Sequence, residues 1–232
     1  MSYDSDLNPV LNHATNNELQ VLVAYIIKKL SNSIETDPRY QAYPEEPLRY
    51  VDLISDEIRR MGGNSFVNLF RGEGVSYHEV VCDVAKKLKV NFNKHSSAER
   101  IEELILNKVF EDAWERMSEC ERQEVLNDLP SGSFSGGAAT MTAQTLLKLG
   151  AFSSYQIAVI VANAIAKFIL GRGLSLAANA GLTRALGVFL GPIGWVVTGI
   201  WTAIDIAGPS YKTTIPCVIQ VAMIRRSPQR DP

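Results

Sequence analysis

The feature that most constrains this chain is a run of twenty uncharged residues, Ala185 to Ile204, which lies between Arg184 and Asp205. A helix rises about 1.5 Å per residue, so a helical run of this length would extend about 30 Å. That distance suits both the hydrocarbon of a bilayer and the core of a small domain. The run therefore predicts either a segment that meets lipid or a helix buried in protein.

Charge divides the chain into two unlike parts. Residues 1–130 hold 15 Lys and Arg against 23 Asp and Glu, whereas residues 131–232 hold 8 against 2. This asymmetry indicates either attraction between the two parts or an anionic partner such as a membrane surface. The basic residues of the second part stand singly in apolar sequence, so nucleic acid is not expected as a partner.

Cysteine content and the amino-terminal sequence bear on location. Cys82, Cys120 and Cys217 are odd in number, far apart and without a CxxC pair, which is typical of a reducing compartment. The start of the chain, MSYDSDLNPVLNH, is polar and acidic and does not resemble a secretory signal. We expect a cytoplasmic protein, or one bound peripherally to the inner membrane from the cytoplasmic side.

Helix starts are legible because Ser or Thr is repeatedly followed, three residues later, by Glu or Gln, the spacing of a capping box. The pairs are Thr15/Glu18, Ser76/Glu79, Ser96/Glu99, Ser118/Glu121 and Ser153/Gln156. Alternating apolar and polar runs, which favour strands, are scarce. The sequence therefore predicts an all-α protein, a multi-helix bundle with a Gly/Ala-rich apolar helical hairpin in its C-terminal half.

Apolar spacing and glycine or proline breaks place the individual helices. The expected helices are 16–30, 48–61, a short one capped by Asn64, one opened by Ser76, 97–117, 119–129, 138–149, 154–170, 174–187, 192–207 and 211–226. Residues 31–47 hold three prolines and are expected to form a surface loop, and Pro216 is expected in a first helical turn. In helix 97–117, the side chains of Glu102, Glu103, Glu111 and Glu115 are expected to face water.

Composition predicts the domain organisation. The expected parts are an N-terminal helical module with a Pro-containing loop (1–46), an acidic helical domain (47–130), a Gly/Ser linker (131–137) and an apolar basic helical region (138–232). The last part holds a second uncharged run, Leu149 to Ala166, and many small residues, as do packed helices in lipid.

Three interpretations of the apolar region remain open: a soluble core, a peripheral or reversibly inserting segment, and a true membrane span. Gly191-Pro192 interrupts one run, and Gln156, Asn163 and Lys167 lie in or beside the other. Trp195 and Trp201 suit a membrane interface. The residues expected to contact lipid or a partner are Leu186, Phe189, Leu190, Trp195, Val196, Ile200 and Trp201.

Two small constellations in the acidic part suggest binding chemistry. Arg71, Gly72 and Gly74 form a glycine turn before a helix start, an arrangement able to receive an anion, although most such turns are only turns. His78 and Cys82 lie one helical turn apart, a spacing that metal ligands use. Two ligands do not make a zinc site, so we expect a buried Cys82, a half-exposed His78, no metal and no other cofactor.

Three segments carry a resemblance to a known family: GGNSFVNLFRGEGVSYHEVVCDVAKKLKV, ERMSECERQEVL and SYKTTIPCVIQVAMIRR. They resemble the uncharacterised bacterial YaaW-like family, which is grouped with the ubiquinol–cytochrome c chaperone domain. The opening DSDLNPVLNHATNNELQVLVAYI resembles the short helical module that often precedes that domain. The resemblance implies an all-helical protein and, more remotely, assistance in assembling a membrane respiratory complex. It supplies no catalytic residues.

Three functional hypotheses follow. The leading one is a non-enzymatic, membrane-proximal helical protein, chaperone-like or assembly-factor-like, that engages lipid or a membrane-protein client through its apolar C-terminal half. The alternative is a membrane-active, pore-forming effector with a sequestered hydrophobic hairpin. The third is a small ligand- or nucleotide-binding protein centred on Arg71, Gly72, Gly74 and His78. Homo-oligomerisation is compatible with the first two.

Overall fold

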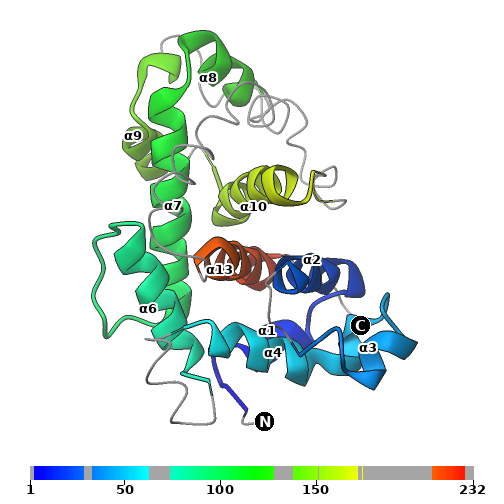
Figure 1. Cartoon of the computed structure of the whole chain (residues 1–232). Helices are drawn as coiled ribbons and strands as arrows, with labels where there is room; N and C mark the ends of the chain where they lie inside the picture. Colours follow the sequence, from blue (N-terminus) through cyan, green and yellow to red (C-terminus); the bar gives the residue numbers. More distant parts are fainter. Residues whose placement is uncertain are drawn as a thin grey trace. The chain divides into compact units, whose positions relative to one another are not determined.

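The computed structural model describes residues 3–28, 33–62, 74–127, 138–150, 152–171, 174 and 211–227. Across these ranges the regular structure is helical, without strands, which confirms the all-α prediction (Figure 1). The chain forms two compact units: residues 1–105 together with 204–232, and residues 106–203. The short helix predicted after Asn64, the predicted linker 131–137, the predicted helix 174–187 except Leu174, and the predicted helix 192–207 lie outside the described residues.

The first unit contains most of the described helices. They are α1 (Asn8–Asn12), α2 (Asn16–Ile27), α3 (Pro38–Ala42), η1 (Pro47–Tyr50), α4 (Val51–Arg60), α6 (Tyr77–Lys87), the start of α7 (Ala98–Arg116) and α13 (Tyr211–Arg226). The second unit contains the end of α7, then α8 (Glu119–Leu126), η2 (Ala138–Thr140), α9 (Ala143–Lys148) and α10 (Ser154–Leu170).

Local capping explains where several of these helices begin. The reciprocal capping box is present at Thr15/Glu18, Ser118/Glu121 and Ser153/Gln156. At α6 the Ser76 hydroxyl accepts from the Glu79 backbone N–H at 3.2 Å. The prediction for α7 was wrong by one position, because the Ser97 hydroxyl accepts from the Arg100 N–H at 3.3 Å and takes the capping place assigned to Ser96.

Other boundaries differ from the predictions for equally local reasons. The expected loop 31–47 contains α3, in which Pro38 occupies the first turn and the Asp37 carboxylate caps the Arg39 N–H at 2.8 Å. The expected helix 48–61 is divided into η1 and α4. The expected helix 138–149 is also divided, into η2 and α9. The Thr142 hydroxyl accepts from the Thr145 N–H at 3.3 Å and caps the start of α9.

In the first unit the core forms around α13, which packs against α1, α2 and α6 (Figure 1). All residues from Thr213 to Ile224 are buried, so this helix is enclosed over three turns. Pro216 lies inside the helix and not in its first turn as expected. The ring costs one backbone hydrogen bond there, and burial of the surrounding apolar side chains outweighs that loss.

Candidate functional site

All seven residues predicted to contact lipid or a partner lie outside the part of the chain that the structure describes. Leu186, Phe189, Leu190, Trp195, Val196, Ile200 and Trp201 lie outside the described residues, as do Arg71 and Gly72 of the predicted anion turn. Their roles stay predictions. The structure does place Gly74, the His78–Cys82 pair and the apolar helix α10, and it adds an ionic cluster that the sequence pattern did not indicate.

Gly74 lies directly against the end of α4. A Cβ atom on this residue would come within 2.7 Å of the Arg59 carbonyl carbon and 2.8 Å of the Arg60 nitrogen. The Arg59 guanidinium donates to the carbonyl oxygens of Gly74 at 3.2 Å and Val75 at 2.9 Å. Asp4 lies 3.6 Å from the same guanidinium. Close packing thus accounts for a glycine at position 74, and anion binding at this turn stays a prediction.

His78 and Cys82 form a contacting pair on one face of α6. His78 Nε2 lies 2.8 Å from the Ser96 carbonyl oxygen, which only accepts, so this nitrogen carries the proton. In the neutral imidazole Nδ1 is then the acceptor, and it faces Cys82 Sγ at 3.7 Å. Burial, followed by the nearby Asp83 and Glu79 carboxylates, raises the thiol pKa against the opposing effect of Lys86. The pair therefore holds a protonated thiol in place.

The burial predicted for this pair is confirmed, since Cys82 is buried and His78 is partly exposed. A raised pKa disfavours the thiolate, which is the form that attacks electrophiles and binds metals. Among the residues that the structure describes, no group of three His, Cys, Asp or Glu is arranged to hold a metal ion. The geometry assigns the His78–Cys82 pair a structural role in joining α6 to the loop before α7.

Glu102 is the centre of a buried ionic cluster. The prediction that it faces water was wrong, because its side chain is wholly buried. One carboxylate oxygen accepts from Arg225 Nε at 2.9 Å and Arg226 Nη1 at 3.2 Å. The other accepts from the Tyr77 hydroxyl at 2.9 Å and Arg225 Nη2 at 3.1 Å. Burial, and then the charge of Glu102, keeps the pKa of Tyr77 well above its ordinary value.

This cluster joins segments that are distant in the sequence. Arg225 also donates to the Asp6 carbonyl oxygen at 2.8 Å, and Arg226 donates to that of Glu99 at 2.8 Å. The amino-terminal segment, α6, α7 and α13 are therefore tied together around one carboxylate. Both carboxylate oxygens of Glu102 accept hydrogen bonds from Tyr77 and the two arginines. This indicates that the cluster is structural, because its carboxylate is fully engaged within the fold.

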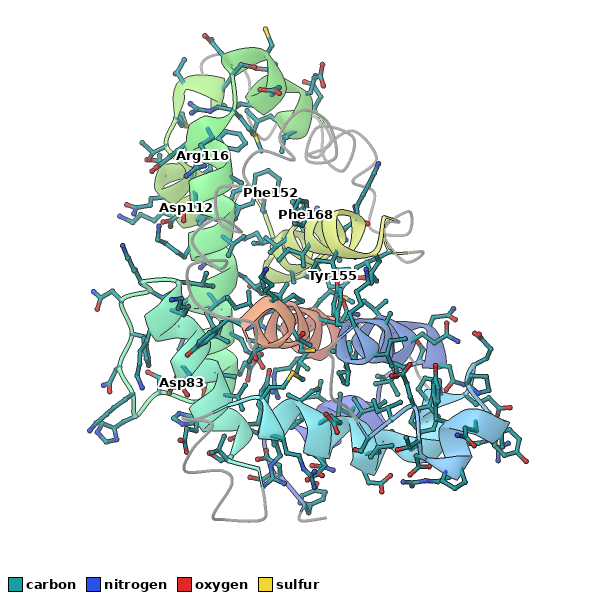
Figure 2. All side chains as sticks on the ribbon, viewed as in Figure 1. Asp83, Asp112, Arg116, Phe152, Tyr155 and Phe168 are labelled. Carbon is teal, nitrogen blue, oxygen red and sulfur yellow. The ribbon has the colours of Figure 1, made fainter. Side chains whose placement is uncertain are left out.

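The second unit contains an aromatic cluster on the later turns of α7. Phe110 stacks with Trp114 at a centroid distance of 6.0 Å, and it meets Phe152 edge-on at 5.2 Å. Trp114 donates its indole N–H to the Met141 carbonyl oxygen at 2.9 Å. Figure 2 shows Phe152 beside α7, ahead of the start of α10. The cluster therefore holds the start of α10 on α7.

Helix α10 is the most apolar element of the described chain. It runs from the Ser153 capping box to Gly171, which adopts the left-handed conformation (φ 72°) that glycine favours at helix ends. Ten successive residues, Ile157 to Ala166, are buried, and Asn163 is the only polar one among them. The side-chain amide oxygen (Oδ1) of Asn163 accepts from the Leu174 backbone N–H at 2.7 Å. This helix is thus enclosed on every side over nearly three turns.

The far end of α10 is less covered. Phe168 is 42% exposed, and Leu149, before the helix, is 57% exposed. These are among the few large apolar side chains of the described residues that reach solvent (Figure 2, Phe168). Within the described ranges, no helix has both the length and the apolar character needed to cross a bilayer.

Comparisons with known proteins show which family the chain resembles. The family model described as ubiquinol–cytochrome c chaperone matches residues 46–219. A UPF0174 protein of Helicobacter pylori strain J99 is 46% identical over 206 residues, covering 88% of this chain and 80% of that protein. The UPF0174 protein YaaW of Escherichia coli strain K12 is 30% identical over 190 residues, covering 80% and 75%. No solved structure matches. The resemblance seen in the sequence is confirmed.

Proposed function

The chain belongs to the ubiquinol–cytochrome c chaperone family, and from this we propose that it is a non-enzymatic, chaperone-like assembly factor acting on a protein client. In the finer form of the proposal, it works beside a membrane and engages lipid or a membrane-protein client through its apolar C-terminal half. It does so from the cytoplasmic side, as the cysteine usage suggests.

The observation that carries the proposal is the burial of α10 on all sides. A helix that is apolar around its whole circumference needs cover from its own chain or from a partner. Residues 157–166 have that cover in the free chain. An assembly factor that holds apolar clients needs apolar surface of its own, kept covered until the client arrives.

The sequence after α10 supports the same reading. The uncharged run Ala185–Ile204 follows α10 in the sequence, so the C-terminal half holds two apolar segments that a client or a bilayer would contact. The two tryptophans of this run, Trp195 and Trp201, suit the boundary between headgroups and hydrocarbon. A pore-forming role would use the same segments, and the experiment below distinguishes the two.

The test is flotation of the full-length protein with phospholipid vesicles, followed by a carbonate wash. We expect the protein to float and to remain bound after the wash. The variant Leu190→Asp/Val196→Asp should lose binding, because a charge in the hydrocarbon costs about 2.5–3.5 kcal/mol per residue. A control, Asn17→Asp/Gln144→Asp, adds the same charge at exposed first-turn positions of α2 and α9 and should bind normally.

Fluorescence locates the contact. The chain has three tryptophans, so the tryptophan fluorescence of a Trp114→Phe variant comes only from Trp195 and Trp201. Lipids brominated on their acyl chains should quench this emission when the protein binds. Absence of flotation with any vesicle would refute the membrane part of the proposal. Release of a trapped dye by the bound protein would favour the pore-forming alternative.

A further inference from the structure

A basic surface lies within the otherwise acidic first part of the chain. Residues 84–98 contain four lysines and one histidine and no Asp or Glu, although residues 1–130 carry a net charge of −8. These lysines follow the end of α6 and the loop that leads to α7. Lys86, Lys89 and Lys94 are exposed, and Lys87 is partly exposed.

The start of α13 adds an aromatic ring and a fifth lysine to this surface. Helices α6 and α13 pack together in the same unit, and Lys87 Nζ lies 5.6 Å from the centroid of the Tyr211 ring. Lys212 is exposed beside it. We call the group Lys86, Lys87, Lys89, Lys94 and Lys212, together with Tyr211, the lysine surface.

The requirements of the fold explain only part of this surface. Lys86 and Lys87 lie in the last turn of α6, where cations interact favourably with the helix dipole, and Lys86 pairs with Asp83 at 3.2 Å. Lys212 lies in the first turn of α13, where the dipole disfavours a cation. Lys89 and Lys94 have no carboxylate partner among the described residues.

Lys89 is held in a conformation that glycine would adopt at lower cost. Its φ angle is +55°, and it is the one non-glycine residue of the described chain with positive φ. The Val90 N–H donates to the Ala85 carbonyl oxygen at 2.9 Å, and the Lys89 N–H donates to that of Lys86 at 3.1 Å. These two bonds define a Schellman ending, whose left-handed position is usually glycine. Strain at this position points to a use for the lysine side chain.

The sequence around Tyr211 indicates the kind of partner. The uncharged run Ala185–Ile204 ends six residues before α13 begins, so in the sequence the most apolar run closely precedes Tyr211 and Lys212 of the lysine surface. Lysines and a tyrosine beside an apolar segment are the arrangement found where proteins meet anionic headgroups. We propose that the lysine surface binds the headgroups of anionic phospholipids. This inference rests on the proposed membrane role and assigns the charged part of the contact.

The experiment uses the full-length protein and the variant Lys89→Asn/Lys94→Gln/Lys212→Gln. Lys89 and Lys94 have no carboxylate partner among the described residues, Lys212 lies where the helix dipole disfavours a cation, and asparagine tolerates positive φ, so thermal stability should change little. Binding to mixed phosphatidylcholine–phosphatidylglycerol vesicles should weaken by a factor on the order of 100 at low ionic strength, about fivefold per lysine. Added salt should weaken vesicle binding by the wild-type protein until it approaches that of the variant.

A charge-matched control distinguishes the effect of the lysine surface from the effect of the net charge of the protein. The variant Arg100→Gln/Arg116→Gln/Lys148→Gln removes three exposed cations elsewhere and should bind anionic vesicles as the wild type does. Equal binding by the wild type and the lysine-surface variant would overturn the inference, as would equal wild-type binding to neutral and anionic vesicles. Charge-dependent binding to a mixed-sequence RNA without binding to anionic vesicles would also overturn it.

The two proposals fail in different ways. If the lysine-surface variant binds normally while Leu190→Asp/Val196→Asp does not, the inference is wrong and the proposed function survives. If the wild-type protein binds no vesicle of either composition, the inference and the membrane part of the proposed function are both wrong.

Discussion

Glu102 accepts two hydrogen bonds from Arg225, at 2.9 Å and 3.1 Å, across 123 residues of sequence. The carboxylate is wholly buried, whereas the Arg225 side chain keeps 19% of its surface exposed. A buried charge without a partner is very costly, so this pairing and that of Arg226 make the position of α13 on α7 specific.

The first prediction concerns this pair. Glu102→Gln should destabilise the first unit by about 3–5 kcal/mol, because it leaves two arginines without their buried counter-charge. The neighbouring Glu103→Gln is the matched control, since Glu103 pairs with Arg100 at the surface and should contribute less than about 1 kcal/mol. Urea unfolding followed by circular dichroism measures both. Equal effects of the two variants would contradict the buried cluster.

The second prediction concerns Gly74. Gly74→Ala should lower stability by about 1–3 kcal/mol, because its Cβ would overlap backbone atoms of Arg59 and Arg60 that cannot move alone. Gly150→Asn is the control, at a left-handed position (φ 70°) with open space around it, and it should have little effect. Thermal unfolding of the two variants decides. A fully stable Gly74→Ala protein would refute close packing as the reason for this glycine.

The third prediction concerns Lys89. Lys89→Gly should raise the free energy of unfolding by about 0.5–1 kcal/mol, because glycine adopts positive φ without the steric cost that lysine bears. The same substitution should reduce binding to anionic vesicles. Urea unfolding and flotation on one preparation measure the two effects. A loss of stability would contradict the prediction and show that contacts of the Lys89 methylene groups outweigh the cost of its positive φ.

The fourth prediction concerns thiol reactivity. Cys120 is exposed, whereas Cys82 and Cys217 are buried. A maleimide at neutral pH should therefore modify one thiol quickly, and Cys120→Ser should abolish that fast phase. Cys82 should react only on unfolding, since burial both shields it and raises its pKa, which lowers the thiolate fraction. Mass spectrometry identifies the modified residue, and fast labelling of Cys82 would contradict the His78 contact.

The fifth prediction concerns alkaline pH. Burial, with smaller effects of Tyr40 and Glu45, raises the pKa of Tyr50 to about 12, and burial also raises that of Tyr77. Above pH 10 the unfolded chain therefore binds fewer protons than the folded one, so stability falls as pH rises from 10 toward 12. Tyr50→Phe should make this fall shallower.

Urea midpoints measured between pH 8 and 11 test the alkaline prediction. Tyr3→Phe, at a residue that is 70% exposed, is the control and should leave the slope unchanged. An identical slope for Tyr50→Phe and the wild type would show that Tyr50 does not remain protonated in the folded state.

The sequence by itself determined the helical class and most helix starts. Capping at Thr15, Ser118 and Ser153 depends on groups three residues apart, so local sequence is sufficient to predict it. The buried stripe of α4, including Ile54 and Ile58, follows from apolar spacing alone. The family resemblance likewise rests on contiguous motifs and was confirmed.

Only the tertiary structure decided what the charged residues do. In the sequence Glu102 and Glu103 look alike, and only the packing of α13 on α7 buries the first and leaves the second partly exposed. In the same way, the helix dipole alone favours arginines at the end of a helix, where Arg225 and Arg226 lie. Local preference likewise favours a proline such as Pro216 in a first helical turn. Their actual places depend on contacts more than a hundred residues distant, whose free energy outweighs these local preferences.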